Sequence, residues 1–149
     1  MIVLLDTNIV GRLSQPAHDL HPVAVAATEH LLKEGHQLRV VPQVLYEFWA
    51  VATRPMEENG FGFSIEQSQV ELDRIKLIFP PLRDERGILE PWESLVRKYA
   101  VRGKNTHDAR LVAAMQRHGV THLMTFNLTD FRRYSEIELL DPASYAPSK

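Results

Sequence analysis

The chain has 149 residues and a formal net charge of -2, which fits one globular domain over residues 1–149 without a global positive field to attract nucleic acid. Its hydrophobic fraction of 44% and charged fraction of 24% are those of a folded protein and exclude a largely disordered chain. The absence of cysteine excludes disulfides, thiolate zinc sites and a cysteine nucleophile, and it favours a reducing, cytoplasmic setting.

The first half of the chain alternates short apolar runs with helical patterns. The run IVLLD at residues 2–6 is apolar up to Asp6, which is typical of a central strand in a parallel sheet. This run is too short for a signal peptide, and no later segment reaches the length of a membrane span, so we expect no membrane association. Pro22 and Gly35 mark the start and end of one helix, and Pro42 opens the next. The elements expected here are strands at 2–6 and 37–41 and helices at 7–13, 22–35 and 42–54.

The second half begins with the turn-forming residues 55–64 and then returns to the same alternation. Ser64 and Gln67 have the spacing of a capping box, which opens a helix that extends to about residue 76. The apolar run IKLIF at 75–79 predicts a further strand. The remaining elements expected are helices at 92–100 and 106–118, a strand at 121–126, a short helical turn at 128–134 and a strand at 137–141.

Strands that alternate with helices predict right-handed crossovers and a parallel sheet with helices on both sides. The fold class expected is therefore α/β, as a three-layer α/β/α sandwich with a central parallel five-stranded sheet. Ligands of such sheets bind beyond the carboxyl ends of the strands, so that edge is where functional residues are expected.

The helix expected at 106–118 carries a charge on its apolar face. Leu111, Val112 and Met115 recur at helical spacing and form an apolar stripe. Asp108 lies three, four and seven residues before them, so a rotation of about 100° per residue places its carboxylate within that stripe. An acid in the first turn could simply interact with the helix dipole, but this role does not require a place on the buried face.

Three further acids lie near the same edge of the predicted sheet. Asp6 ends the first strand, Glu47 lies at the border of the apolar arc of the third helix, and Asp130 follows the strand at 121–126. Each also has a structural interpretation. Asp6 could cap the next helix, Asp130 could stabilise a helix dipole, and Glu47 could be solvated at the helix flank.

A shared spacing links two of these acids to an asparagine. Asn105 precedes Asp108 by three residues, and Asn127 precedes Asp130 by three. Because asparagine is a favoured N-cap residue, both pairs predict a cap followed by an acid in the first helical turn.

Several carboxylates gathered at one partly buried edge would raise one another's pKa values until some became neutral. A divalent cation removes this cost, and Mg²⁺ or Mn²⁺ prefers such hard oxygen ligands. A site of this kind can activate water and stabilise the leaving oxygen of a phosphodiester. The acids therefore predict a metal-dependent hydrolase.

Four features in this order resemble the PIN-domain nucleases, and most closely the VapC-like ribonucleases, over nearly the whole chain. They are the motif IVLLDTN, Glu47 on the third helix, the motif HDARLVAAM around Asp108 and the motif TFNLTDF. The resemblance implies an α/β/α sandwich and an endoribonuclease that depends on Mg²⁺ or Mn²⁺, with Asp6, Glu47 and Asp108 as metal ligands and catalytic residues. Family members usually have a fourth acid, and either Asn127 or Asp130 occupies that position here.

The resemblance also implies partners. Many VapC-like ribonucleases are toxins of toxin–antitoxin pairs, so a protein antitoxin is expected beside the RNA substrate, and a homodimer is plausible. The neighbours of the acids are candidate substrate contacts, although each also has a structural interpretation as a helix cap or a surface residue. These candidates are Thr7, Asn8, His107 and Asn127.

Phe61 and Phe63, in the loop before Ser64, could stack on unpaired bases or pack onto the core.

Two other functions compete with the ribonuclease. A catalytically silent PIN-like module would keep the fold and bind RNA or a protein without cleaving it. A receiver-like signalling domain would need a phosphoacceptor aspartate after a middle strand, and the predicted third strand does not end in one.

Overall fold

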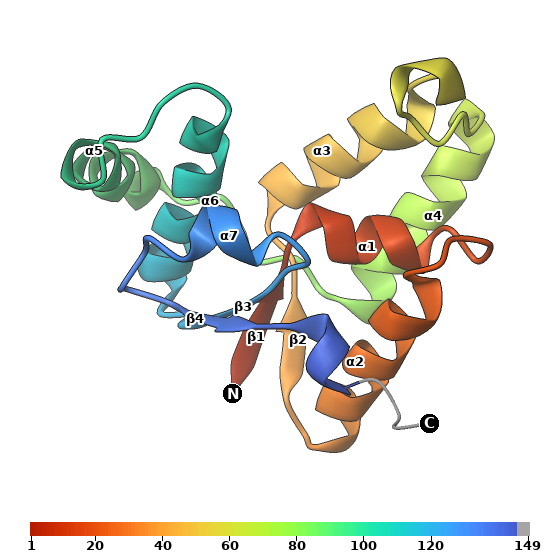
Figure 1. The fold of residues 1–149 in the computed structure, drawn as a ribbon, viewed down its shortest axis with the longest axis horizontal. Helices are drawn as coiled ribbons and strands as arrows, with labels where there is room; N and C mark the ends of the chain where they lie inside the picture. The colour runs from red at the N-terminus through yellow and green to blue at the C-terminus, as the bar shows by residue number, and fades with distance from the viewer. Residues whose placement is uncertain (146–149) are drawn as a thin grey trace.

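The computed structural model describes residues 1–145, which alternate strands and helices along the chain (Figure 1). Most elements lie close to their predicted limits. The strands are β1 (Ile2–Leu5), β2 (Gln37–Arg39), β3 (His122–Met124) and β4 (Glu138–Leu140). The helices are α1 (Thr7–Leu13), α2 (His21–Lys33), α3 (Pro42–Thr53), α4 (Ile65–Ile78), α5 (Leu89–Lys98), α6 (Asn105–His118) and α7 (Leu128–Phe131), with short 3-10 turns at Met56–Glu58, Arg86–Ile88 and Pro142–Tyr145.

The four strands form one parallel sheet in the order β2-β1-β3-β4. Val3 of β1 pairs with Leu38 on one side and with His122 on the other. In Figure 1, helices α1 to α4 lie on the right of the strands and α5 to α7 on the left. The prediction of an α/β fold with a parallel sheet flanked by helices is therefore confirmed.

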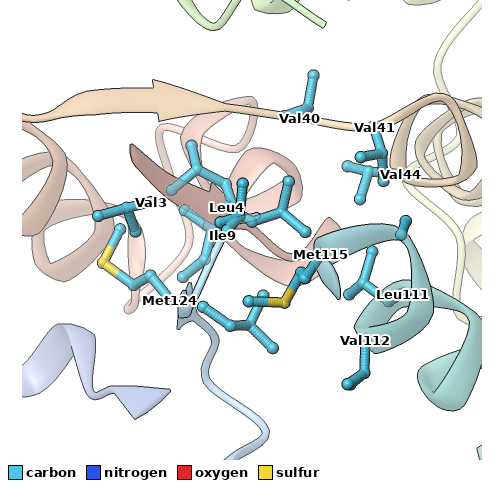
Figure 2. Close-up of a cluster of buried hydrophobic side chains, with 14 of the residues drawn as sticks. Val3, Leu4, Ile9, Val40, Val41, Val44, Leu111, Val112, Met115 and Met124 are labelled. Carbon is cyan, nitrogen blue, oxygen red and sulfur yellow. The ribbon is translucent and has the colours of Figure 1, made fainter. Parts of the chain in front are cut away.

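The core is built from apolar side chains of β1 and of the helices on both sides of it. Val3 and Leu4 of β1, Val44 of α3 and Leu111 and Met115 of α6 are all buried and belong to the one cluster drawn in Figure 2. Burial of the central strand on both faces accounts for its uninterrupted apolar sequence. No helix within residues 1–145 is both long and apolar enough to cross a membrane.

The prediction of a strand at 75–79 is wrong, and within residues 1–145 the sheet has four strands instead of five. These residues form the end of α4, which the predicted capping box of Ser64 and Gln67 opens. Ile75 and Phe79 are buried while Leu77 is 83% exposed, so the run has the four-residue period of a helix. An apolar run this short has no periodicity that separates a strand from a helix in the sequence.

The segment that follows α4 still pairs with the edge of the sheet at one point. Val40, just after β2, forms a single parallel bridge with Pro81, and its carbonyl accepts a hydrogen bond from the Leu82 amide at 2.8 Å. Pro80 and Pro81 have no amide hydrogen to donate, so a ladder cannot extend along this segment. The position expected for a fifth strand is therefore occupied by one bridge.

Candidate functional site

A cleft opens at the carboxyl ends of β1 and β3, where the parallel sheet was expected to bind its ligand. It consists of two adjoining depressions of about 500 and 430 Å³, and both are lined by Glu47, Asp108 and Asn127. The first depression also contains Asp130, and the second contains Asp6. All eight residues predicted for the site line this cleft: Asp6, Thr7, Asn8, Glu47, His107, Asp108, Asn127 and Asp130.

Asp6 follows β1 directly and is the N-cap residue of α1. Its Oδ1 accepts a hydrogen bond from the Thr7 amide at 2.7 Å, and its Oδ2 accepts one from the Thr125 hydroxyl at 2.8 Å. Burial raises the pKa of Asp6 to about 6, the bonds from Thr125 and Thr7 oppose this shift, and the nearby Glu47 adds to it. The helix-capping role and a place at the cleft are thus combined in one residue.

Thr125 and Asn8 join α1 to the segment that follows β3. Thr125 is fully buried, and its hydroxyl oxygen accepts hydrogen bonds from Asn8 Nδ2 at 3.1 Å and from the Asn127 amide at 2.9 Å. Asn8 Oδ1 accepts in turn from the Phe126 amide at 3.2 Å. Sequence reasoning missed Thr125, because it placed this residue inside the strand predicted at 121–126, whereas β3 ends at Met124 and Thr125 follows it directly.

Glu47 extends from α3 toward α1 and is fixed by two donors. The Thr7 hydroxyl donates to Oε2 at 3.0 Å, and Gln43 Nε2 donates to Oε1 at 2.8 Å. Thr7 therefore contacts Glu47 with its side chain instead of capping the helix, because Asp6 occupies the N-cap position.

Gln43 is a second residue that sequence reasoning missed. It is 8% exposed, and besides Glu47 its Nε2 contacts the carbonyl oxygen of His107 at 2.8 Å. Its Oε1 accepts from Arg110 Nη1 at 3.1 Å. The available signal was its position one helical turn before Glu47 on α3. Gln43 thereby links the acid on α3 to the start of α6.

Asp108, in the first turn of α6, is the carboxylate most affected by its neighbours. Burial raises its pKa to about 7, followed by the negative charges of Asp6, Asp130 and Glu47, while Lys104 opposes the shift. Within residues 1–145 no hydrogen bond reaches its side chain, and no lysine or arginine forms an ion pair with any of these four acids. Asp108 is partly buried beside the other acids, as its predicted inward direction requires, and residues 1–145 supply it with no ion-pair partner.

The two asparagines do not cap their helices with their side chains as predicted. The N-cap of α6 is Lys104, so Asn105 lies inside the helix, where its Oδ1 is buried without a partner. Asn127 occupies the N-cap position of α7, but its Nδ2 donates to Asp130 Oδ2 at 2.6 Å. Both asparagines therefore lie at the start of a helix as the spacing predicted, but the Asn127 side chain is oriented by its Nδ2 donating to the Asp130 carboxylate, and its Oδ1 does not accept from the helix amides.

The four acids line one cleft, but within residues 1–145 they do not form a complete set of metal ligands. Among residues 1–145, no three histidine, aspartate or glutamate side chains have the mutual arrangement of a metal site. His107 lines the cleft and is exposed at its rim. The arrangement offers hard oxygen donors at several positions, which suits a cation that keeps part of its water shell.

Comparison with known proteins identifies the fold. No family model matches the chain, and no curated protein is similar to it in sequence. The search of solved structures finds chains similar to this one in VapBC2 from Rickettsia felis, bound to a promoter DNA fragment, in a toxin–antitoxin complex from Klebsiella pneumoniae and in the sarcin-ricin loop cleaving toxin VapC20 from Mycobacterium tuberculosis.

These likenesses extend over nearly the full length of both chains. The Rickettsia chain has 18% identity and a TM-score of 0.71, with 94% of this chain and 98% of that chain covered. The Klebsiella chain has 20% identity and a TM-score of 0.62, with 94% and 97% covered. VapC20 has 18% identity and a TM-score of 0.63, with 91% and 98% covered. Since identities this low establish the fold alone, the chain has the fold of the VapC PIN-domain toxins.

Proposed function

We propose that this protein is an endoribonuclease that hydrolyses RNA phosphodiester bonds in the acidic cleft and depends on Mg²⁺ or Mn²⁺. The observation that carries the proposal is the environment of Asp108. Burial raises its pKa, three other carboxylates raise it further, and within residues 1–145 no ion pair offsets these effects. A bound cation would supply the missing positive charge.

The donor set fits a hard divalent cation. Asp6 and Asp108 would hold it directly or through water, and Glu47 would complete the site, because all three are oxygen ligands at one depression. When bound, the cation would lower the pKa of water and stabilise negative charge on the phosphate. Asp130 lies near enough to Asp108 to raise its pKa, which supports it as a fourth acid.

The chain's own residues would position the reactants. Glu47, oriented by Thr7 and Gln43, would accept a hydrogen bond from the attacking water and hold its proton. Lys104 and His107 line the same depression as Glu47, where they would contact phosphate oxygens of the RNA. As the bond from phosphorus to the ribose oxygen breaks and the water oxygen joins the phosphorus, solvent water in the open cleft would protonate the leaving oxygen, and Glu47 would return its proton to solvent.

The structural neighbours support a role in a toxin–antitoxin pair. Those named in the comparison come from VapBC or toxin–antitoxin complexes, or are a toxin themselves. We infer that a protein antitoxin covers the acidic cleft of this chain in the cytoplasm, and that two copies can associate. A receiver-like function is disfavoured because β3 is followed by Thr125, where that mechanism requires an aspartate.

A catalytically silent RNA-binding module is the second candidate, favoured by the lack of a finished ligand shell among residues 1–145. Cleavage of single-stranded and structured RNA separates the two functions when Mg²⁺, Mn²⁺ or chelator is added. Asp6→Asn and Asp108→Asn should each lower the rate by about 10³-fold, because they remove cation ligands worth several kcal/mol in the transition state.

The matched control is Asp73→Asn, which makes the same charge change at an exposed position of α4. It should cleave like the wild type. Equal cleavage by all four proteins, or cleavage that survives chelation, would rule out catalysis at this cleft. RNA binding without cleavage would support the silent module.

A further inference from the structure

The second depression of the cleft continues beyond the acids into an arm of different chemistry. Next to Asp6 and Glu47 it is lined by Arg12, Arg54 and Phe61. Two positively charged side chains and an aromatic ring therefore lie in the same depression as the acids. We call these three residues the basic arm.

Neither guanidinium of the basic arm has an acidic partner in the part of the chain that the structure describes. Within residues 1–145, no carboxylate lies at ion-pair distance from Arg12 or Arg54. Arg12 Nη1 donates only to the neutral Gln15 Oε1 at 2.6 Å, and its Nε is buried without an acceptor. Arg54 is exposed at the end of α3. An anionic oxygen would satisfy donors that the protein leaves without a charged partner.

Phe61 is fixed in the arm by the loop that follows α3. Its amide donates to the Val51 carbonyl at 2.9 Å, and the Gly62 amide donates to the Arg54 carbonyl at 2.9 Å. These bonds bring the loop back against the end of α3. The loop can approach so closely because residue 60 is glycine, since a Cβ there would collide with the Arg54 carbonyl oxygen. The ring is therefore held by backbone contacts in addition to its own packing.

The ring of Phe61 packs against neighbouring residues and is still partly exposed to solvent. It makes edge contacts with Phe48 and Phe63, at centroid distances of 6.4 and 5.5 Å. It also lies over Gly11, where an added Cβ would meet the ring at 3.2 Å. Both loop phenylalanines thus pack onto the core, yet Phe61 keeps enough accessible surface to line the cleft.

We propose that the basic arm binds the nucleotide adjacent to the scissile phosphate. Phe61 stacks on its base while Arg12 and Arg54 contact its phosphate. A base can stack on a protein ring only when it is unpaired, so the substrate class is RNA with a single-stranded segment at the cut site. The second depression, which the arm shares with the acids, has a volume of about 430 Å³, so a nucleotide beside the scissile phosphate fits within it. This inference rests on the proposed ribonuclease function.

The test is equilibrium binding in the presence of chelator, which separates binding from cleavage. Fluorescence anisotropy would be measured with a labelled single-stranded oligoribonucleotide, with the same strand carrying abasic positions and with a blunt duplex. The wild type should prefer the intact single strand by about tenfold over the abasic strand. Phe61→Leu, which keeps an apolar side chain, should lose this preference.

Arg54→Gln supplies a variant that leaves the fold unchanged, because the side chain is exposed. It should weaken binding about 3- to 10-fold and reduce the salt dependence by roughly one phosphate contact. Arg74→Gln removes the same charge from α4 outside the acidic cleft, where Arg74 is 65% exposed, and should bind like the wild type.

Equal affinity of the wild type for intact and abasic strands, or of Arg54→Gln and the wild type for RNA, would overturn the basic arm as an RNA site. Equal RNA affinity of Arg54→Gln and the wild type would instead favour a protein segment as the ligand of the basic arm. The outcome is distinguishable from failure of the proposed function. RNA that binds as described but is not cleaved with Mg²⁺ or Mn²⁺ refutes the ribonuclease, whereas cleaved RNA with unchanged affinities in both variants refutes only the arm.

Discussion

The two sides of the cleft hold their carboxylates differently. On the side of α1 and α3, Asp6 receives hydrogen bonds from Thr7 and Thr125, and Glu47 receives two from Thr7 and Gln43. On the side of α6, Asp108 receives none from residues 1–145. Burial raises the pKa of both aspartates, to about 6 for Asp6 and about 7 for Asp108. Donors to a carboxylate stabilise its ionised form, and of these two aspartates only Asp6 has them among residues 1–145.

The two sides therefore differ in whether their carboxylates are held in place before a ligand binds. The α1 and α3 side fixes the direction of its oxygens before a ligand arrives, through bonds that join α1, α3 and the segment after β3. The α6 side leaves Asp108 exposed to the repulsion of three other acids. A cation would therefore act mainly on Asp108, while Asp6 and Glu47 would supply a fixed frame.

Removing the donor that holds Asp6 should give the largest effect on stability. Thr125→Val removes the 2.8 Å donor to Asp6 Oδ2, so that among side chains only the longer contact of 3.5 Å from Asn8 Nδ2 remains. It also leaves the Asn127 amide without its acceptor. We expect the free energy of unfolding to fall by about 2 kcal/mol, the usual cost of losing hydrogen bonds to a buried charged group. Urea denaturation at neutral pH measures it.

Thr28→Val is the matched control for this change. Thr28 is also buried, but its hydroxyl donates to the carbonyl oxygens of Ala24 and Val25 in its own helix. Its replacement should cost less than about 1 kcal/mol, because those carbonyls keep partners in the helix. Equal losses in the two variants would show that Thr125 acts only as a packed side chain.

On the α6 side, a substitution is expected to raise the free energy of unfolding instead of lowering it. The pKa of Asp108 is raised from its ordinary value of 3.8 to about 7, so the folded state keeps a proton that the unfolded state has lost. Stability should therefore fall as the pH rises from about 4 to about 7 and stay level above that range. Asp108→Asn removes this loss and should be more stable by about 1 kcal/mol at pH 8, after allowance for partial exposure.

Thermal melts in chelator across this pH range measure the effect, which corresponds to about 3 °C. The curves of the wild type and Asp108→Asn should meet near pH 4 and separate as the pH rises. Added Mg²⁺ should stabilise the wild type and leave the variant unchanged, because only the wild type retains the ligand. A variant that is less stable at every pH would mean that Asp108 supports the structure.

The comparison also shows how far the sequence could predict the site. The inward direction of Asp108 follows from helix rotation within α6, which is a local property of the sequence. Thr125 could not be found in this way, because it meets Asp6 across 119 positions of the chain. Gln43 reaches the His107 carbonyl across 64 positions. Local periodicity predicts which way a side chain points, whereas hydrogen-bond partners depend on how distant elements pack.

The same limit explains the error in the sheet. The run at 75–79 is apolar enough for a strand, but the pattern of burial that makes it helical depends on what α4 packs against. The prolines that limit the fifth strand to one bridge are visible in the sequence, yet their effect depends on the neighbouring Val40. The order of elements was therefore predictable, and the strand count was not.

The smallest effect should come from the pair at the fourth acidic position, where the sequence left two alternatives. Asn127 Nδ2 contacts Asp130 Oδ2 at 2.6 Å, and the pair lies at the edge of the cleft. Neither Asp130→Asn nor Asn127→Ala should change stability by more than about 0.5 kcal/mol, because the contact is exposed. Each should slow RNA cleavage a few-fold, since Asp130 adds to the negative potential at Asp108.

If Asn127 only orients Asp130, the double variant should be no slower than Asp130→Asn alone, because the amide has nothing left to orient. Single-turnover cleavage at saturating Mg²⁺ measures all three variants. A double variant slower by the product of the two single effects would show that Asn127 contacts the RNA independently. A larger loss for Asn127→Ala than for Asp130→Asn would assign the fourth position to the amide and leave Asp130 as its support.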